Sequence, residues 1–551
     1  MLASFRRFIG LFILLLATIA IIFGYQGVSA TATPDAAEQS TAHTRFENTS
    51  QLTTPQLIEQ ALANGTIGPD VARLYLAYAL GSYDQLPKEY QSNAPWDGTF
   101  VLQALQDGVD QMTNRSARAV VESLLTGSCG SSSVPLSSVA NSTYFHIEYS
   151  SIGGGLTIAN YVTSLDTSWN TEVNSFGWAA PPVLGSNPPP GNRYHVRIEN
   201  LGGGLYGYVS SSGVHAGFVG NNPHTTWNEL DAYASCMVLN NNYSGFSGSP
   251  QRALDATTAH EFAHSIQFGY GILTGENAID SNVIEGGATW MEDEVFDASD
   301  DNYNYLWPNF SMCMGQYAAS PYPYWITWRG LTERHGTGSP GAGEQIMQDF
   351  WESASQSATN NFFPALNAAL ANKGTTLADA YHAYAITVKF NKSCGGNYAY
   401  PYCFEEGANY VGAAGTTSVH GSIGSVGSSS SGSIADNYTL NWISLPLSGS
   451  QYDITLQNTS GGGSMRGSIV CDTGSQLRVN SLSSVAGGGQ TSTLSNYDST
   501  GCTSVVAVIT NQAQTADNPS SCAARSYQIS TSVSTPFVPT DFIYLPYTLD
   551  N

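Results

Sequence analysis

The sequence predicts an α+β protein: a small helical region, then a mixed domain of a sheet and helices, then a C-terminal all-β sandwich. Two observations support this prediction. Apolar residues recur at helical spacing up to residue 125, alternate at strand spacing from residue 143, and return to helical spacing around residue 257. Beyond a stretch rich in Gly and Ser, short alternating strands follow again.

Composition limits the classes of partner. The chain has 551 residues, enough for two or three domains with full-sized cores. Its 18 basic and 42 acidic residues give a net charge of −24, which repels nucleic acid and anionic membranes, so we exclude both as partners. Few charged residues and abundant Gly and Tyr are typical of an extracellular protein. The oligomeric state stays open.

The N-terminus has the features of an export signal. Two arginines precede an apolar run at 8–23, and small residues follow up to Ala30. We therefore predict a signal peptide at 1–30, cut after Ala30, and a secreted protein without membrane contact after cleavage. The alternative is an uncleaved anchor, because a run of about 16 residues is close to the shortest membrane span.

The next region, 31–135, begins with a stretch rich in Ala, Thr and Ser that we expect to be disordered. Thr54 and Pro55 begin a helix, a second helix runs over 69–80, and two more lie within 100–125. The region is either a pro-segment that covers the site of the next domain or a structural cap on that domain. We favour the cap.

Strands and then helices make up the predicted central domain, 136–411. The strands are expected at 144–149, 194–200, 206–211 and 234–240, and the helices at 257–270, 284–295, 343–351, 363–371 and 377–390. Residues 412–435 are mostly Gly, Ser, Thr and Ala, which predicts a flexible linker. Strands at 438–442, 452–456, 504–510 and 527–533 predict a β-sandwich over 436–535, and the tail at 536–551 has no interpretation.

The helix at 257–270 contains the most informative motif of the chain. His260 and His264 stand four residues apart, with Glu261 directly after the first. This spacing places two imidazoles on one helical face, where they can bind zinc, with a carboxylate beside them as base. Apolar residues line the helix face opposite the histidines, so that apolar face can pack on a core. The alternative is a chance pair of surface histidines.

Glu285 begins the following helix and can supply a third zinc ligand, because a connection between two helices can bring it back to the metal. The alternative is an acidic residue that only stabilises the first turn of the helix. Gly286 and Gly287 argue against that alternative, since adjacent glycines weaken a helix and make sense where another group must approach closely.

The motifs HEFAHSIQFGY and EGGATWMED together resemble the gluzincin type of zinc metalloprotease. More narrowly, the chain is similar over roughly residues 50 to 400 to a group of secreted bacterial metalloproteases named after a myxobacterial protein, which also have counterparts of CMVLNNNYSGF and LTERHG. The resemblance implies a zincin-like catalytic domain, one catalytic zinc bound by His260, His264 and Glu285, and Glu261 as general base.

Other roles follow from the resemblance with alternatives left open. Many gluzincins have Asp where this chain has Thr289, so Glu292 is the candidate to orient a ligand instead. The strand at 234–240 is either an edge on which an extended peptide pairs or an ordinary interior strand. Tyr322, Tyr324 and His335 are candidates to stabilise an oxyanion, and Tyr324 ranks first.

An acidic run offers a candidate calcium loop, with oxygen donors from Asp297, Asp300, Asp301 and Asn302. No EF-hand spacing is present, so we favour a solvated acidic loop over a Ca²⁺ site.

The eight cysteines fit export and allow 105 sets of four disulfides. Cys394 and Cys403 are close enough in sequence for a local bridge. Cys471, Cys502 and Cys522 cannot all pair with one another, which leaves a bridge between domains or a free thiol.

The expected function is that of a secreted zinc-dependent endopeptidase acting on a protein or peptide substrate. We expect activity to fall below about pH 6, because the ligand histidines must be neutral. The first alternative is a catalytically inactive zinc-binding surface or adhesion protein that acts through its β-sandwich. The second is hydrolysis of a non-peptide amide at the same site.

Overall fold

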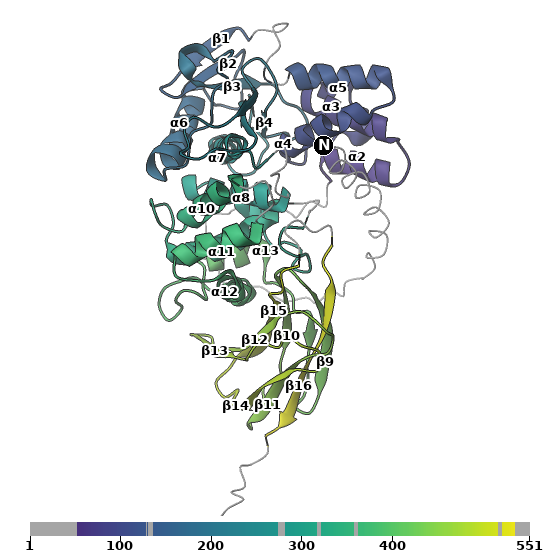
Figure 1. The fold of residues 1–551 in the computed structure, drawn as a ribbon, viewed down its shortest axis with the longest axis vertical. Coiled ribbons are helices and arrows are strands. Elements are labelled where there is room, and N and C mark those ends of the chain that lie inside the picture. The colour runs from purple at the N-terminus through teal and green to yellow at the C-terminus, as the bar shows by residue number, and fades with distance from the viewer. Residues whose placement is uncertain are drawn as a thin grey trace, which may run out of the picture.

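The computed structural model describes residues 52–127, 129, 136–273, 281–316, 321–356, 362–515 and 521–534. The predicted signal peptide, the start of the chain at 31–48 and the tail at 536–551 lie outside these residues. Figure 1 shows an α+β arrangement, with a sheet and a group of helices at one end, further helices in the middle and a β-rich region at the other end. Among the described residues, no helix combines the length and apolar character needed to cross a membrane.

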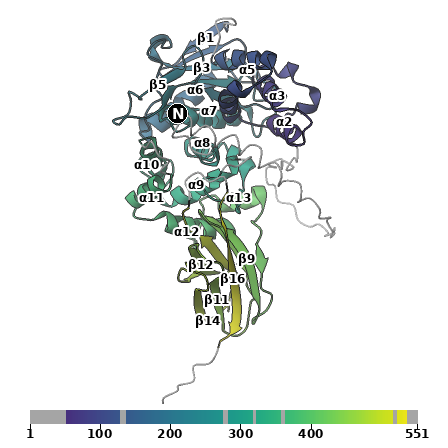
Figure 2. The same cartoon turned by 45° about the vertical axis from the view of Figure 1, so that its right-hand side comes forward.

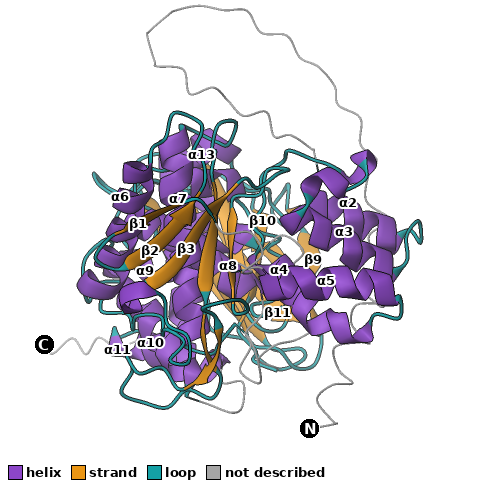
Figure 3. Ribbon diagram, turned by 90° about the horizontal axis from the view of Figure 1, so that it is seen from above, coloured by secondary structure: helices purple, strands orange, loops and turns teal. Residues whose placement is uncertain are grey.

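Four helices near the N-terminus confirm the prediction of a small helical region. They are α2 (Thr54–Ala63), α3 (Pro69–Gly81), α4 (Thr99–Gly108) and α5 (Arg115–Gly127). Thr53 forms a capping box with Gln56 at the start of α2. Seen from above, the four helices form a group on one side of the sheet (Figure 3). Their apolar core also includes Leu205 and Val238, so the group packs directly on the central domain.

The central sheet has the strand order β1-β2-β3-β7-β4. Its strands are β1 (Ser138–Asn141), β2 (Phe145–Tyr149), β3 (Tyr194–Glu199), β4 (Gly207–Ser210) and β7 (Cys236–Asn240). β2, β3 and β7 run parallel, whereas β1 and β4 are antiparallel to their neighbours. A short hairpin of β5 (Gly217–Gly220) and β6 (Ala232–Ala234) lies outside this sheet.

The edge role considered for the strand at 234–240 is wrong, because β7 lies between β3 and β4. All five of its residues are buried, as expected for an apolar run with neighbours on both sides. The edge of the sheet on this side is β4.

Helices pack against the sheet and fill the middle of the molecule (Figures 1 and 2). They are α6 (Ile158–Trp169), α7 (Pro250–Gly269), α8 (Ser281–Val295), α9 (Trp325–Thr332), α10 (Glu344–Ser355), α11 (Phe362–Asn372), α12 (Leu377–Phe390) and α13 (Gly407–Ala414). α7 carries the HExxH motif and starts at Pro250, earlier than predicted, after a Ser249 side-chain cap. Phe262 of α7 packs edge-on against Phe145 of β2 and Tyr194 of β3, which fixes the helix on the sheet.

The C-terminal region contains two sheets that share one apolar core. Their strand orders are β13-β12-β15-β10-β8 and β14-β11-β16-β9. The strands are β8 (Gly421–Ser422), β9 (Ser429–Ala435), β10 (Thr439–Ser444), β11 (Tyr452–Asn458), β12 (Met465–Asp472), β13 (Leu477–Ser481), β14 (Thr491–Tyr497), β15 (Ser504–Asn511) and β16 (Ala524–Val533).

The prediction of a flexible linker over 412–435 is wrong. α13 covers its first residues, and β8 and β9 belong to the C-terminal sheets. β9 pairs with β16 along its whole length, from Ser429 to Ala435. Only Ile434 of β9 is buried, so the strand depends on backbone pairing more than on apolar packing.

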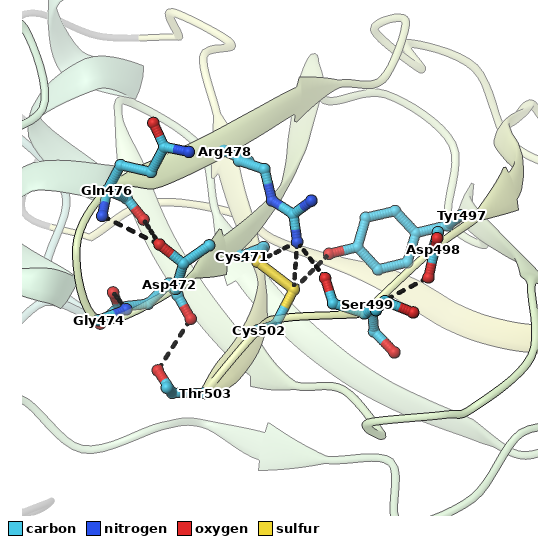
Figure 4. The surroundings of a disulfide bond; sticks show 12 residues. Cys471, Asp472, Gly474, Gln476, Arg478, Tyr497, Asp498, Ser499, Cys502 and Thr503 are labelled. Atoms are coloured by element: carbon cyan, nitrogen blue, oxygen red, sulfur yellow. Dashed lines mark hydrogen bonds between the residues drawn. A yellow bond between two sulfur atoms is a disulfide. The ribbon is translucent and has the colours of Figure 1, made fainter.

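All eight cysteines form disulfide bonds, and none is free. The predicted bridge between Cys394 and Cys403 is confirmed. Cys471 pairs with Cys502 within the C-terminal region, where the Arg478 guanidinium lies 3.1 Å from both sulfurs (Figure 4). The two remaining bonds, Cys313–Cys522 and Cys129–Cys236, join distant parts of the chain. Four disulfides fit an extracellular protein.

Candidate metal site

Two neighbouring helices bring the predicted zinc ligands together. His260 and His264 lie one turn apart on α7, and Glu285 lies on α8. The Nε2 atoms of the two histidines are 3.1 Å apart, and a carboxylate oxygen of Glu285 lies 3.0 Å from the first and 3.4 Å from the second. All three side chains are buried. The sequence motif therefore forms a compact group of possible metal donors.

The opposite ring nitrogens of both histidines have hydrogen-bond partners. Nδ1 of His260 lies 2.7 Å from a carboxylate oxygen of Glu292, and Nδ1 of His264 lies 2.7 Å from the amide oxygen of Gln267. The amide nitrogen of Gln267 donates to the Ile284 carbonyl, which leaves its oxygen facing His264. Both Nδ1 atoms therefore donate, so in the neutral rings the lone pairs are on Nε2.

The chemistry of this donor set fits a cation. Two Nε2 lone pairs and a Glu285 carboxylate oxygen point at one another across 3.0 to 3.4 Å. Lone pairs in this arrangement repel unless a proton or a metal ion lies among them. Glu292 and Gln267 hold the rings in the required orientation, as partners of metal-binding histidines do. The position of Glu292 agrees with its predicted role in place of Thr289, and Gln267 was not foreseen.

The electrostatics of the site also favour a positive charge. Burial lowers the pKa of His260, but Glu285 and Glu292 raise it well above its usual range. Burial raises the pKa of Glu285, whereas His264 and His260 lower it to about 2. Glu285 is thus held as a carboxylate, the form that binds metals.

The two glycines after Glu285 allow close packing, as the sequence suggested. A Cβ on Gly286 would lie 3.0 Å from Cβ of Tyr324, and one on Gly287 would lie 3.1 Å from the Trp351 ring. These contacts are tighter than side chains normally make. α8 therefore approaches the segment at 322–325 and α10 more closely than it could with larger residues.

Glu261, the predicted base, is fully buried beside the metal donors. One of its carboxylate oxygens accepts a hydrogen bond of 3.1 Å from the Thr99 hydroxyl, and the other has no hydrogen-bond partner. Burial raises the pKa of Glu261 well above its usual range, and the nearby Asp97 carboxyl raises it further. Glu261 is thus positioned to exchange a proton with a group in the cavity.

Sequence reasoning missed two residues of the site, Asp97 and Thr99, which come from the N-terminal region. One carboxylate oxygen of Asp97, donor atoms of His260 and His264, and an oxygen of Glu285 all lie within 4.8 Å of one another. Asp97 belongs to the sequence PWDGTF between two helices, where no apolar period or metal-binding spacing identifies it. Only the contact between distant segments places it at the metal donors.

The cavity beside these residues is small. It has room for about one water molecule. Tyr206, Tyr305 and Tyr322 form part of its wall, together with Asp97, His260 and Glu261.

Of the three candidates to stabilise an oxyanion, only Tyr322 lines the cavity. Its hydroxyl accepts a hydrogen bond of 3.2 Å from the backbone N–H of Asp97. The hydroxyl of Tyr324, the first choice from the sequence, lies 3.4 Å from the carbonyl of Asn309, and His335 contacts Arg334 instead. Geometry therefore favours Tyr322 over Tyr324. The reason is that the turn at 322–324 sends the two tyrosines in different directions.

The predicted calcium donors do not converge in the structure. Asp300 pairs with Arg252, Asp301 accepts a hydrogen bond from Tyr206, and the amide of Asn302 donates to Asp293. A different acidic group, Asp293 with Asp297 and Glu406, lies close enough together to hold a cation. Asp293 already pairs with Arg329 at 2.9 Å. The calcium site, the less favoured alternative, is therefore not formed by its four predicted donors, and the favoured solvated loop is correct only in part, because Asp301 and Asn302 are buried.

Neither models of known protein families nor curated protein sequences give a match to this chain. Interpretation of the site therefore depends on its own geometry and chemistry.

Proposed function

We propose that the protein is a secreted zinc-dependent endopeptidase with its active site on α7 and α8. The observation that carries this proposal is the convergence of His260, His264 and Glu285, with the buried carboxylate of Glu261 lining a cavity together with His260. Two imidazoles, one carboxylate and a neighbouring carboxylate base are typical of catalytic zinc in peptidases. The sheet packed on α7 and the helices that follow support a zincin-like catalytic domain, and the four disulfides support export.

Different residues of the site have different roles in peptide hydrolysis. A zinc ion, when bound, supplies Lewis acidity that activates water and polarises a carbonyl group. His260, His264 and Glu285 would hold the ion. Glu261 accepts a proton from the attacking water and delivers it to the leaving amine nitrogen. The Tyr322 hydroxyl, on the cavity wall, donates a hydrogen bond to the carbonyl oxygen as negative charge develops.

Metal content and casein cleavage test the proposal together. We would measure both on the exported protein before and after limited proteolysis, with and without a chelator. Glu261→Gln is expected to keep one zinc per chain and to lose activity by about 10²- to 10⁴-fold, because proton transfer is lost. His264→Ala is expected to lose both zinc and activity. Casein cleavage by the Glu261→Gln protein at the wild-type rate would refute the assignment.

A second candidate function is that of a catalytically inactive zinc-binding surface or adhesion protein that acts through its β-rich region. The observation that favours it is the fourth donor, Asp97, because four protein ligands are typical of structural zinc. One zinc per chain, without cleavage of any unfolded substrate before or after limited proteolysis, would support this alternative.

A further inference from the structure

Asp97 reaches the metal donors from a part of the chain that is separate from the catalytic helices. Its side chain is buried, with 8% of its surface exposed. One carboxylate oxygen accepts a hydrogen bond of 2.8 Å from the Thr99 backbone N–H, while the other is buried without a hydrogen-bond partner. The Asp97 and Glu261 carboxyls lie side by side and are both buried, which is costly unless a proton or a cation lies between or beside them. Asp97 is thus placed where it can contact a metal ion at His260, His264 and Glu285.

The same segment also forms hydrogen bonds with the other groups that catalysis needs. The Thr99 hydroxyl donates to Glu261, the proposed base, and accepts from the Val209 backbone N–H at 2.9 Å. The Asp97 N–H donates to the hydroxyl of Tyr322. Base, oxyanion donor and metal position are therefore all engaged by two residues of the N-terminal region.

The segment pairs with the edge of the sheet as well. Trp96 donates from its backbone N–H to Gly204, accepts from Tyr206, and forms a parallel bridge with Leu205. Gly98 donates to the carbonyl of Gly207, the first residue of β4. These bonds use backbone groups on which an extended peptide could add as a strand.

A run of glycines on the catalytic domain accommodates this segment. Gly203 and Gly204 have φ angles of +60° and +72°, and a Cβ on Gly204 would lie 2.5 Å from the carbonyl oxygen of Ala94. The indole nitrogen of Trp96 donates to the carbonyl of Gly203 at 2.8 Å. The Trp96 side chain is buried together with Leu205. Docking thus involves a shaped surface and not only the contact at the metal.

We propose that residues 92–99 form an inhibitory latch, in which Asp97 supplies a fourth ligand to the metal and keeps the enzyme latent until the segment is displaced. This inference rests on the proposed zinc site and peptidase function. Catalytic zinc keeps one position open for water, whereas four protein ligands close the site. The latch offers a side-chain carboxylate and not a peptide carbonyl at that position, so it contains no bond to be hydrolysed there.

The test uses cobalt in place of zinc in the full exported chain, because the visible spectrum of cobalt reports its ligands. The probe is acetohydroxamate, a small chelating anion, and Asp97→Ala is compared with wild type. Asp97→Asn retains the shape of the side chain in case the alanine variant does not fold. Asp84→Ala, an exposed aspartate of the same region, is the matched control.

We expect every variant to bind one cobalt per chain. Acetohydroxamate should change the spectra of both Asp97 variants at concentrations at least about tenfold lower than for wild type or Asp84→Ala. The reason is that removing the carboxylate frees a position at the metal for the probe. A tenfold difference in affinity corresponds to about 1.4 kcal/mol in binding free energy. An equal response of wild type and the Asp97 variants would overturn the latch. Loss of cobalt from folded Asp97 variants would also overturn it, because Asp97 would then be a permanent ligand.

Peptide hydrolysis separates failure of the latch from failure of the proposed function. Casein cleavage by full-length Asp97→Ala above the wild-type rate supports both proposals. Spectral changes restricted to the Asp97 variants, without hydrolysis by any form of the protein, support the latch and refute the peptidase.

Discussion

Acid should weaken the contact between the helical part of the protein and its C-terminal region through one histidine. His382 of α12 is buried between the two parts. Its Nδ1 lies 2.8 Å from the Thr510 hydroxyl and its Nε2 lies 2.8 Å from the Ser468 hydroxyl. Both hydroxyls can rotate to accept a hydrogen bond, so they do not oppose protonation of the ring. Burial opposes protonation of the ring, and the positive charge of Arg466 opposes it further. The pKa of His382 therefore falls to about 3, although Asp379 acts in the opposite direction.

The sign of the pH effect follows from this lowered pKa. The folded protein favours the neutral ring, so the stabilisation is complete above the pKa of an unfolded histidine, about 6.5, and is lost as the pH falls from there toward the folded value. At pH 4.5 the unfolded chain has taken up a proton that the folded chain resists. The resulting loss is about 2–3 kcal/mol in the free energy of unfolding.

Comparison with His382→Gln isolates this contribution, because glutamine can bond both hydroxyls and does not titrate. We would follow urea unfolding by tryptophan fluorescence at pH 7 and pH 4.5, where Trp442 reports on the same contact through its bond to Ala385. Other groups titrate equally in both proteins, so the wild type should lose about 2–3 kcal/mol more than the variant. The same loss in both proteins would show that His382 is not the origin of the acid sensitivity.

Three further predictions concern the metal site and the latch. Glu292→Ala should lower zinc affinity about 10- to 100-fold, measured by chelator competition, because His260 loses the partner that orients it; unchanged affinity would contradict this role. Removal of zinc from saturated protein should lower its melting temperature by about 4–8 °C in calorimetry, since a ligand at 1,000 times its Kd contributes about 4 kcal/mol; an unchanged melting temperature would mean that no metal stabilises the fold. Gly204→Ala should speed cleavage of the N-terminal region by an added protease at least about tenfold, because a Cβ there meets Ala94. Gly65→Ala, which shares the positive φ but has open space around it, is the control, and equal cleavage of the two variants would argue against a shaped docking surface.

The sequence contained enough information to predict the parts of the site that lie on regular helices. The spacing of His260 and His264 fixes one helical face, and Glu285 lies in the second turn of the next helix, which begins at Ser281, earlier than predicted, so their approach depends on helix geometry and one connection. Glu292 lies two turns beyond Glu285 on the same face, which made its role as partner of His260 foreseeable.

Two kinds of feature could not be predicted. Thr99 contacts Glu261 across 162 residues, and no local pattern encodes a contact at that distance. β9 consists mostly of Ser and Gly that are exposed or half-buried, so its strand conformation comes from pairing with β16 and not from an apolar alternation. The choice between Tyr322 and Tyr324 likewise depends on the path of a single turn.

The disulfide between Cys129 and Cys236 makes release of the N-terminal region a two-step process. It ties the end of that region to β7, the neighbour of the edge strand β4. A single cut of the chain between Cys129 and β1 would leave the region attached, as an intramolecular competitor of substrate at an effective concentration of about millimolar. Such a molecule would be cleaved yet still inhibited, and substrate would have to compete with a tethered carboxylate. Full activity would then require a second cut before Cys129, because both cysteines of this bond are buried and a reductant in solution does not reach the sulfurs.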